Sequence, residues 1–147
     1  MSTRPGVEKL SILIPVYNEV RTLAFALERV ALVDLPCQRE IIIVDDGSSD
    51  GSWDIIQSFV SRHPFAHAFR HSANRGKGAA IRTAIAEMTG DWAIIQDADL
   101  EYDPADYAQL LVPAMEGIAD AVFGSRFLVG RYARALFFWH SLANKLL

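Results

Sequence analysis

Three acidic side chains at alternate positions are the first candidates for chemistry in this sequence. Asp97 and Asp99 are separated by one residue, and Glu101 follows at the same spacing. They come directly after a predicted strand, residues 92–96, so in an extended turn their carboxylates can converge on one hard cation. The alternative is a set of solvated turn residues. Cations in neighbouring segments favour a divalent metal site, for Mg²⁺ or Mn²⁺, that also holds a phosphorylated ligand.

A second acidic cluster, residues 45–51, follows the β-branched segment 40–44. We expect Asp46 to accept hydrogen bonds from ribose hydroxyls or from a base N–H. Gly47 would let the backbone turn and let a flat ring approach. We assign Asp50, by contrast, to capping of the next helix, with Ser52 as the alternative cap.

A glycine-spaced basic segment, residues 74–79, includes Lys77 and opens a predicted helix. It is a candidate cradle for an anion, although it matches neither the P-loop nor the dinucleotide-binding pattern. The alternative is a helix whose small residues pack closely on a sheet. His63, His67 and His71 recur every four residues, but Pro64 prevents one helix from presenting them together, so we expect surface or filling roles for them.

The segments that must position these clusters alternate between strands and helices. We expect strands at residues 10–16, 40–44, 66–71, 92–96 and 121–124, and helices at 19–33, 52–61, 76–88, 104–116 and from 132 onward. Asn18 is the expected cap of the first helix, and Ile85 is expected to face inward in the third. This order predicts an α/β fold with a mostly parallel central sheet flanked by helices. Ligands of such sheets bind outside the carboxyl ends of the strands, where every polar cluster named above lies.

Composition describes an ordinary globular domain. The chain has 147 residues, 51% of them hydrophobic and 22% charged, with a net charge of −4. A general nucleic-acid binder is therefore not expected. The single cysteine, Cys37, excludes an internal disulfide framework. We also expect no signal peptide and no membrane-spanning segment.

Four motifs, in this order and at ordinary spacing, resemble those of family 2 glycosyltransferases of the GT-A fold. They are Ile-Pro-Val-Tyr-Asn-Glu at 14–19, Val-Asp-Asp-Gly-Ser-Ser-Asp-Gly at 44–51, Asn-Arg-Gly-Lys-Gly at 74–78 and Asp-Ala-Asp at 97–99. Two further motifs, Asp-Ala-Asp-Leu-Glu-Tyr-Asp-Pro at 97–104 and Gly-Ser-Arg-Phe at 124–127, resemble the polyprenyl-phosphate sugar transferases, the branch similar to dolichol-phosphate mannosyltransferase. The resemblance implies a single Rossmann-like, nucleotide-sugar-binding GT-A domain over residues 1–147.

The resemblance also implies an activity and its residues. The activity is an inverting transfer of a hexose from a GDP- or UDP-sugar to a polyprenyl phosphate such as a dolichyl or undecaprenyl phosphate. The implied nucleotide contacts are Pro15, Tyr17, Glu19, Asp46, Lys77 and Asp97. The implied metal ligands are Asp97, Asp99 and Glu101, and the phosphate contacts are Arg126 and Arg131.

Family members are longer than this chain, so we expect a fragment that is truncated at its C-terminal end and keeps the nucleotide-binding half. We expect it to lie in the cytoplasm, at the membrane surface where the lipid acceptor resides. The segment from Arg131 to Leu147 is basic and apolar, and the resemblance favours a helix there that contacts anionic lipid. The alternative is a final helix that only packs on the sheet. A fragment that binds the nucleotide sugar without activity of its own is the alternative.

Three other functions compete with this interpretation. A family 2 transferase could instead act on a saccharide hydroxyl, which requires a general base. A nucleotidyltransferase would carry a glycine- and arginine-rich loop after the first strand, where this chain has residues 15–19. A signalling receiver domain would place its acid pair after the first strand, whereas residues 45–46 follow the second.

Overall fold

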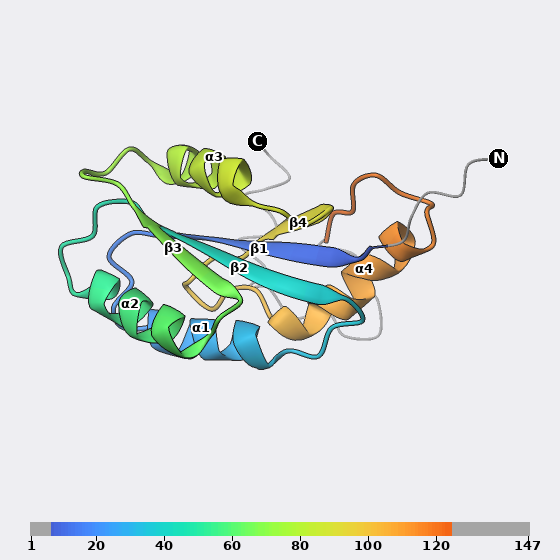
Figure 1. The fold of residues 1–147 in the computed structure, drawn as a ribbon, viewed down its shortest axis with the longest axis horizontal. Coiled ribbons are helices and arrows are strands. Elements are labelled where there is room, and N and C mark those ends of the chain that lie inside the picture. Colours follow the sequence, from blue (N-terminus) through green and yellow to red (C-terminus); the bar gives the residue numbers. More distant parts are fainter. Residues whose placement is uncertain (1–6, 125–147) are drawn as a thin grey trace, which may run out of the picture.

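The sheet at the centre of the molecule has four parallel strands, which confirms the predicted α/β architecture (Figure 1). The structure is a computed structural model that describes residues 7–124. Across the sheet the strand order is β3-β2-β1-β4. The strands are β1 (Lys9–Val16), β2 (Gln38–Asp45), β3 (Ala66–Arg70) and β4 (Trp92–Ile95).

Helices cover both faces of this sheet. Figure 1 shows α3 (Lys77–Glu87) on one face, and α1 (Leu23–Leu32), α2 (Ser52–Arg62) and α4 (Tyr107–Met115) on the other. A 3₁₀ turn, η1 (Pro104–Asp106), leads into α4. The central strands are buried on both faces, which is why residues 12–16 of β1 and 41–44 of β2 are continuously apolar rather than alternating.

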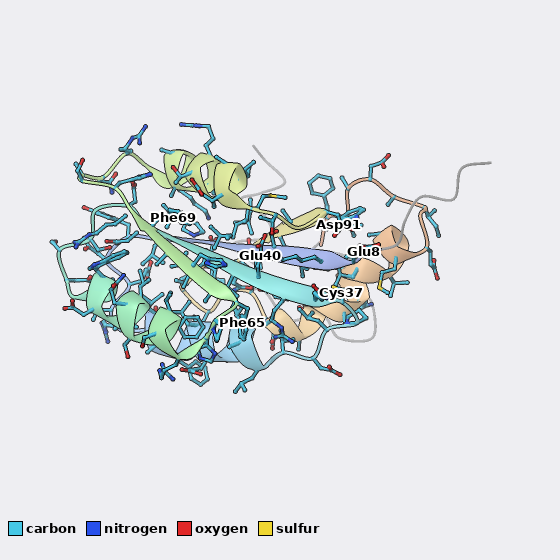
Figure 2. All side chains as sticks on the ribbon, viewed as in Figure 1. Glu8, Cys37, Glu40, Phe65, Phe69 and Asp91 are labelled. Atoms are coloured by element: carbon cyan, nitrogen blue, oxygen red, sulfur yellow. The ribbon has the colours of Figure 1, made fainter. Side chains whose placement is uncertain are left out.

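Two hydrophobic clusters hold these layers together. The larger one joins the sheet to α1, α2 and α4, and Phe65 packs against it. The smaller one joins Leu13 and Ile42 to Ala80 of α3, with Phe69 packed against it. Phe65 and Phe69 therefore lie on opposite faces of the sheet, as Figure 2 shows.

The register of the strands brings their carboxyl ends together. Val16 of β1 is the partner of Asp45 in β2, and Arg70 of β3 is the partner of the same Asp45, so three strands end level. The strand β4 ends earlier, opposite Leu13, and the next amide, that of Gln96, donates to the Leu13 carbonyl at 2.9 Å. The segments 17–20, 46–51, 71–77 and 97–103 all leave the sheet at this side, which we call the carboxyl edge.

The predicted strand at residues 121–124 is wrong. This segment pairs with none of the four strands described, and Phe123 is 89% exposed. Its valine and phenylalanine favour extended backbone, but a strand forms only where a neighbour takes its backbone hydrogen bonds. Within residues 7–124 no strand forms a ladder with it, although it lines a cavity together with Trp92–Ile94 of β4.

Two details of the predicted helices are also wrong. The first helix begins at Leu23, and Asn18 does not cap it, because Asn18 has a φ of 55° and its side chain accepts from the Ser49 amide instead. In α3 the buried positions are alanines, and Ile85 is 52% exposed. By contrast, Asp103 caps η1 as expected, accepting from the Ala105 amide with Pro104 at the first position.

No helix within residues 7–124 has the length and apolar character needed to cross a membrane. The predicted helix from residue 132 lies outside the described residues, as do Arg126 and Arg131.

At the amino-terminal ends of the strands, a buried carboxylate in β2 links β1 to the turn before β4. Glu40 in β2 is 3% exposed and lies on the α3 side (Figure 2). It accepts from the Ser11 hydroxyl at 2.6 Å and from the Thr89 amide at 2.6 Å, and it pairs with Lys9 at 2.9 Å. Burial alone would raise the pKa of Glu40, but these hydrogen bonds outweigh it and lower the pKa to about 2.

Glu40→Gln is expected to destabilise the chain in a pH-dependent way. The folded pKa lies below the unfolded value, so the stabilisation is present above pH 4.5 and is lost as the pH falls toward 2. At neutral pH it amounts to about 3 kcal/mol. Urea unfolding of both proteins between pH 7 and pH 3 should show the difference shrinking as the pH falls. The control is exposed Glu87→Gln, and a pH-independent difference for Glu40→Gln would contradict the expectation.

Candidate functional site

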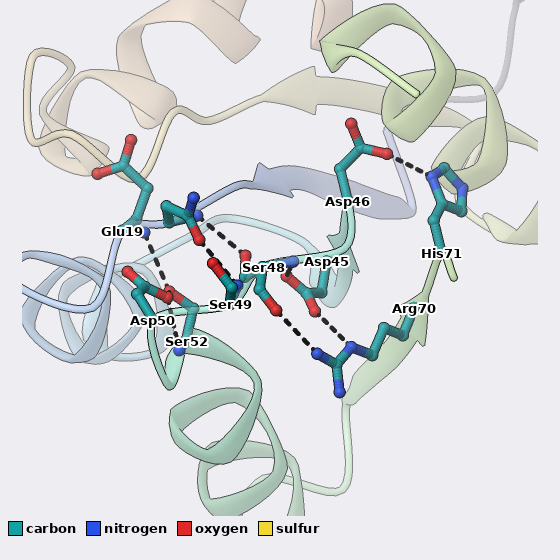
Figure 3. A network of polar contacts seen from close by, with 10 residues as sticks. Glu19, Asp45, Asp46, Ser48, Ser49, Asp50, Ser52, Arg70 and His71 are labelled. Atoms are coloured by element: carbon teal, nitrogen blue, oxygen red, sulfur yellow. Dashed lines mark hydrogen bonds and ion pairs between the residues drawn. The ribbon is translucent and has the colours of Figure 1, made fainter. Parts of the chain in front are cut away.

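The turns that follow β1 and β2 are joined at the carboxyl edge by a ladder of backbone-to-side-chain hydrogen bonds (Figure 3). The Asn18 amide donates to Ser48 Oγ at 2.9 Å, and the Glu19 amide donates to Ser52 Oγ at 3.0 Å. These bonds satisfy amides that no strand or helix takes up, and they hold Asn18 in its left-handed conformation. The two turns therefore form one rigid shelf.

Asp50 supports that shelf in place of a conventional helix cap. Its Oδ1 accepts from the Ser52 amide at 3.0 Å and from the Ser52 hydroxyl at 2.6 Å, while its Oδ2 accepts from the Val20 amide at 3.0 Å. The residue at the cap position of α2 is Gly51, with no capping side chain. Asp50 thus accepts from the first amide of α2, as the capping hypothesis predicts, but it lies one residue before the cap position.

Three of the predicted nucleotide contacts lie on or beside this shelf. Pro15 is the penultimate residue of β1 and is partly exposed. Tyr17 is 47% exposed, which leaves its ring open for stacking. The Glu19 carboxylate accepts a long bond, 3.3 Å, from the Thr22 hydroxyl. The structure brings the three together at the carboxyl end of β1.

Asp45 and Asp46 point in opposite directions and have different partners (Figure 3). Asp45 is fully buried and pairs with Arg70 Nε at 2.9 Å. The Arg70 guanidinium also donates to the Ser48 carbonyl and lies 5.2 Å from the centre of the Trp53 ring. Asp45 therefore anchors the shelf to the end of β3.

Asp46 instead holds the segment that enters α3. Its carboxylate accepts from the amides of Arg75 at 3.0 Å and Gly76 at 2.7 Å, and it contacts His71 Nδ1 at 2.6 Å. Burial alone would raise the pKa of Asp46, but these hydrogen bonds outweigh it and keep the pKa below the ordinary value. The lowered pKa keeps Asp46 ionised at neutral pH, although the residue is only 3% exposed.

Gly47 allows this close approach. Its φ is 77°, and a Cβ atom there would lie 2.7 Å from the Ala73 carbonyl carbon and 2.8 Å from the Asn74 nitrogen. Any other residue would both strain the turn and push the segment 73–76 away. The turn predicted at Gly47 is confirmed, and the structure adds a packing role against the segment 73–76.

Lys77, the first residue of α3, reaches across the carboxyl edge to Asp97. Its Nζ lies 2.6 Å from Oδ1 and 2.7 Å from Oδ2 of that carboxylate. The lysine side chain is 58% exposed and that of Asp97 is 20% exposed. The predicted anion cradle and the predicted metal loop thus meet through one ion pair.

Gln96 and Tyr107 hold the backbone of the segment that carries Asp97, Asp99 and Glu101. Gln96 is 2% exposed, and its Nε2 donates to the carbonyls of Asp97 at 2.9 Å and Tyr102 at 3.3 Å. The buried Tyr107 hydroxyl donates in turn to Gln96 Oε1. This closure forces Leu100 into a left-handed conformation with a φ of 67°. At the end of this segment, Arg29 of α1 pairs with Asp103 at 2.5 Å.

Two of the acids that this segment presents face solvent. Asp99 and Glu101 are exposed, and Asp99 Oδ1 accepts from the Glu101 amide at 3.0 Å. Within residues 7–124, no three His, Cys, Asp or Glu side chains already converge as ligands for one ion. Two carboxylates on one turn nevertheless suit Mg²⁺ or Mn²⁺ when a ligand's phosphate oxygens and water supply the other bonds. The residues present therefore fit a metal that arrives with a diphosphate.

Sequence reasoning missed His71, Gln96 and Tyr107 as residues of this site. The histidine spacing was interpreted as surface or filling, whereas the His71 side chain is 8% exposed and contacts both Asp46 and Thr83. A signal was available for Gln96, because a polar side chain at the end of a predicted strand needs a hydrogen-bond partner if it is buried. Nothing in the spacing points to Tyr107.

Comparison with known sequences gives a consistent family. A model described as glycosyl transferase family 2 matches residues 11–141. A dolichol-phosphate mannosyltransferase from Pyrococcus furiosus is 30% identical over 137 residues, which are 93% of this chain and 38% of that protein. An undecaprenyl-phosphate 4-deoxy-4-formamido-L-arabinose transferase from Yersinia enterocolitica is 37% identical over 121 residues, 80% of this chain and 37% of that protein. The chain thus spans less than two-fifths of the length of these relatives.

Solved structures give a similar fold. The mannosyltransferase PcManGT from Pyrobaculum calidifontis, in complex with GDP-Man and Mn²⁺, superposes with a TM-score of 0.61 at 27% identity, covering 71% of this chain and 30% of that one. S. aureus TarS 1-349 in complex with UDP gives a TM-score of 0.57 at 25% identity, covering 62% of this chain and 27% of that one. Both neighbours are GT-A glycosyltransferases, so the predicted GT-A fold is confirmed.

Proposed function

The chain belongs to glycosyl transferase family 2, and from this premise we propose that it provides the donor-binding half of a polyprenyl-phosphate hexosyltransferase. The reaction is an inverting transfer of a hexose from GDP- or UDP-hexose to a polyprenyl phosphate. The observation that carries the proposal is the meeting of the shelf, the Lys77 segment and the acidic segment at one edge of a parallel sheet. The names of both sequence relatives, which pair a sugar with a dolichol or undecaprenyl phosphate, supply the acceptor class.

On the donor side, the nucleoside lies over the shelf. The exposed Tyr17 ring stacks on a flat base, with Pro15 and Glu19 along the nucleoside. Asp46 remains a proposed nucleoside contact; to accept from the nucleoside, its carboxylate would exchange one of the hydrogen bonds that it accepts from His71, Arg75 and Gly76. Lys77 is placed to reach a phosphate once it leaves Asp97, because its side chain is more than half exposed.

On the diphosphate side, Asp97 and Asp99 would hold Mg²⁺ or Mn²⁺, with Glu101 as a third ligand. A bound divalent ion would neutralise the charge that develops on the departing nucleotide diphosphate. The chain's own contribution is positional, since Gln96 and Tyr107 fix the backbone on which both aspartates stand.

On the acceptor side, a phosphate is already an anionic nucleophile, so the transfer requires no general base. Arg126 and Arg131, which lie outside the described residues, are the proposed contacts that hold phosphates and screen their mutual repulsion. A lipid-borne acceptor places the chain at the cytoplasmic face of a membrane, as a peripheral protein. The partners are then a nucleotide sugar, a lipid phosphate and the membrane surface, with no nucleic acid.

A transfer assay tests this function. The chain is incubated with Mn²⁺ and radiolabelled GDP-mannose or UDP-glucose, with either undecaprenyl phosphate or an oligosaccharide as acceptor. We expect label in the organic phase with the lipid phosphate only. Label on the oligosaccharide would instead support a family 2 transferase that acts on a hydroxyl. Donor binding without transfer to either acceptor would leave a nucleotide-sugar-binding fragment without activity of its own.

Lys77→Met is expected to change the affinities for metal and nucleotide in opposite directions. The lysine ammonium occupies both oxygens of Asp97, so its removal should raise the affinity for Mn²⁺ alone by about two- to fivefold, the range of an exposed ion pair. The same change should weaken GDP or UDP binding, because a phosphate contact is lost. Isothermal titration of each ligand measures both effects, with exposed Arg82→Met on the same helix as control. Two shifts of the same sign would contradict this role for Lys77.

A further inference from the structure

We infer that His71 is a positioning residue: it fixes the Asp46 carboxylate, which in turn holds the segment 74–76 and places Lys77 opposite Asp97. The inference rests on the proposed function only for its consequence, the binding of a nucleotide diphosphate. Its structural part concerns the described residues alone and can be tested without any ligand.

The His71 ring is enclosed between two elements on opposite sides. Its side chain is 8% exposed, with Nδ1 2.6 Å from Asp46 Oδ1 and Nε2 2.9 Å from Thr83 Oγ1 of α3. An ionised carboxylate can only accept hydrogen bonds, so the proton lies on His71 Nδ1. The Thr83 hydroxyl can then donate to Nε2, which fixes the ring plane.

Asp46 passes this constraint to the backbone of the next segment. Its Oδ1 accepts hydrogen bonds from His71 Nδ1 and from the Arg75 amide, and its Oδ2 accepts from the amides of Arg75 and Gly76. Without the histidine, the carboxylate is free to rotate about its Cβ–Cγ bond and to lose one amide. The close contact of Gly47 with Ala73 and Asn74 shows independently that this segment is docked on the Asp46 turn.

Lys77 links the position of the segment 74–76 to the acidic segment. Gly76 has a φ of 88° and is followed at once by Lys77, whose ammonium contacts both oxygens of Asp97. The path from His71 through Asp46 and Gly76 to Lys77 therefore consists of contacts that are all present in the structure. His67, in β3 four residues before His71, is exposed and is a matched control for the loss of a histidine.

Amide hydrogen exchange of the free chain tests the structural part. In His71→Leu we expect the Arg75 and Gly76 amides to exchange about tenfold faster or more, while amides of the central strands, such as Ile42, keep their protection. In His71→Asn the side-chain amide can take the place of Nδ1–H, so protection should return. Equal acceleration across the whole sheet, or no change at Arg75 and Gly76, would overturn the inference. His67→Leu should change neither amide.

Titration with GDP and UDP in the presence of Mn²⁺ tests the consequence. We expect His71→Leu to weaken binding about tenfold, and His71→Asn and His67→Leu to stay within about twofold of the unmodified chain. If His71→Leu does not fold, the Asn variant still decides: a tenfold loss in Asn, with Arg75 and Gly76 still protected, would overturn the inference. If the unmodified chain binds neither nucleotide, the proposed function fails, and the exchange experiment alone decides the role of His71.

Discussion

Asp99→Ala should abolish metal-dependent nucleotide binding, a loss of about 100-fold or more in the affinity for GDP or UDP with Mn²⁺. Asp99 is exposed and its Oδ1 accepts from the Glu101 amide, and an exposed carboxylate has further lone pairs with which to bind an ion. The part of the nucleotide affinity that is lost is the part due to the metal ion, which would bind both the protein and the diphosphate. Isothermal titration with Mn²⁺ present and with EDTA measures it.

The fold should not change in this variant. The backbone of the acidic segment is held by Gln96 and by the pair of Arg29 with Asp103, neither of which involves Asp99. A matched control is Asp34→Ala, an exposed aspartate between α1 and β2, away from the carboxyl edge. The role of Asp99 would be disproved by an affinity that is the same in the variant, with and without EDTA.

Asp46→Asn should have the second-largest effect, a loss of about tenfold or more in nucleotide affinity together with a lower melting temperature. Asp46 accepts from His71 and from two backbone amides with its two carboxylate oxygens. An asparagine has only one acceptor oxygen, because its other terminal atom is the donor nitrogen. One buried donor is left unpaired, and the segment that carries Lys77 is released.

Asp50→Asn is the matched control, because Asp50 also accepts two backbone amides at the same edge. Its partners are Val20 and Ser52, which belong to the shelf and to α2 rather than to the segment before Lys77. We expect a cost of about 1 kcal/mol in unfolding free energy with little change in affinity. A larger loss of affinity in Asp50→Asn than in Asp46→Asn would mean that the two roles are reversed.

The parallel sheet and the position of the site could be predicted from the sequence because both depend on local patterns. Continuous apolar runs mark the buried strands β1 and β2, and the polar clusters follow the strand ends directly. The segment 121–124 shows where this fails: its residues favour a strand, but pairing depends on what lies beside it, which spacing along the chain does not encode.

The partners within the site could not be predicted because they are distant in sequence. Asp46 contacts His71, and Lys77 contacts Asp97, across separations of 25 and 20 residues. Both pairs depend on which strands lie side by side and in what register, and packing in three dimensions sets that register. The left-handed Leu100 is likewise unpredictable, because the hydrogen bonds of Gln96 impose it against its local preference.

One measurement tests the central claim, that the carboxyl edge binds a nucleotide sugar together with a divalent cation. GDP-mannose and UDP-glucose are titrated calorimetrically into the chain with Mn²⁺, and each titration is repeated with EDTA. We predict saturable binding of at least one donor with Mn²⁺ and a loss of that binding with EDTA, both absent in Asp99→Ala. Binding of neither donor under any of these conditions, by a chain that unfolds cooperatively, would contradict the account.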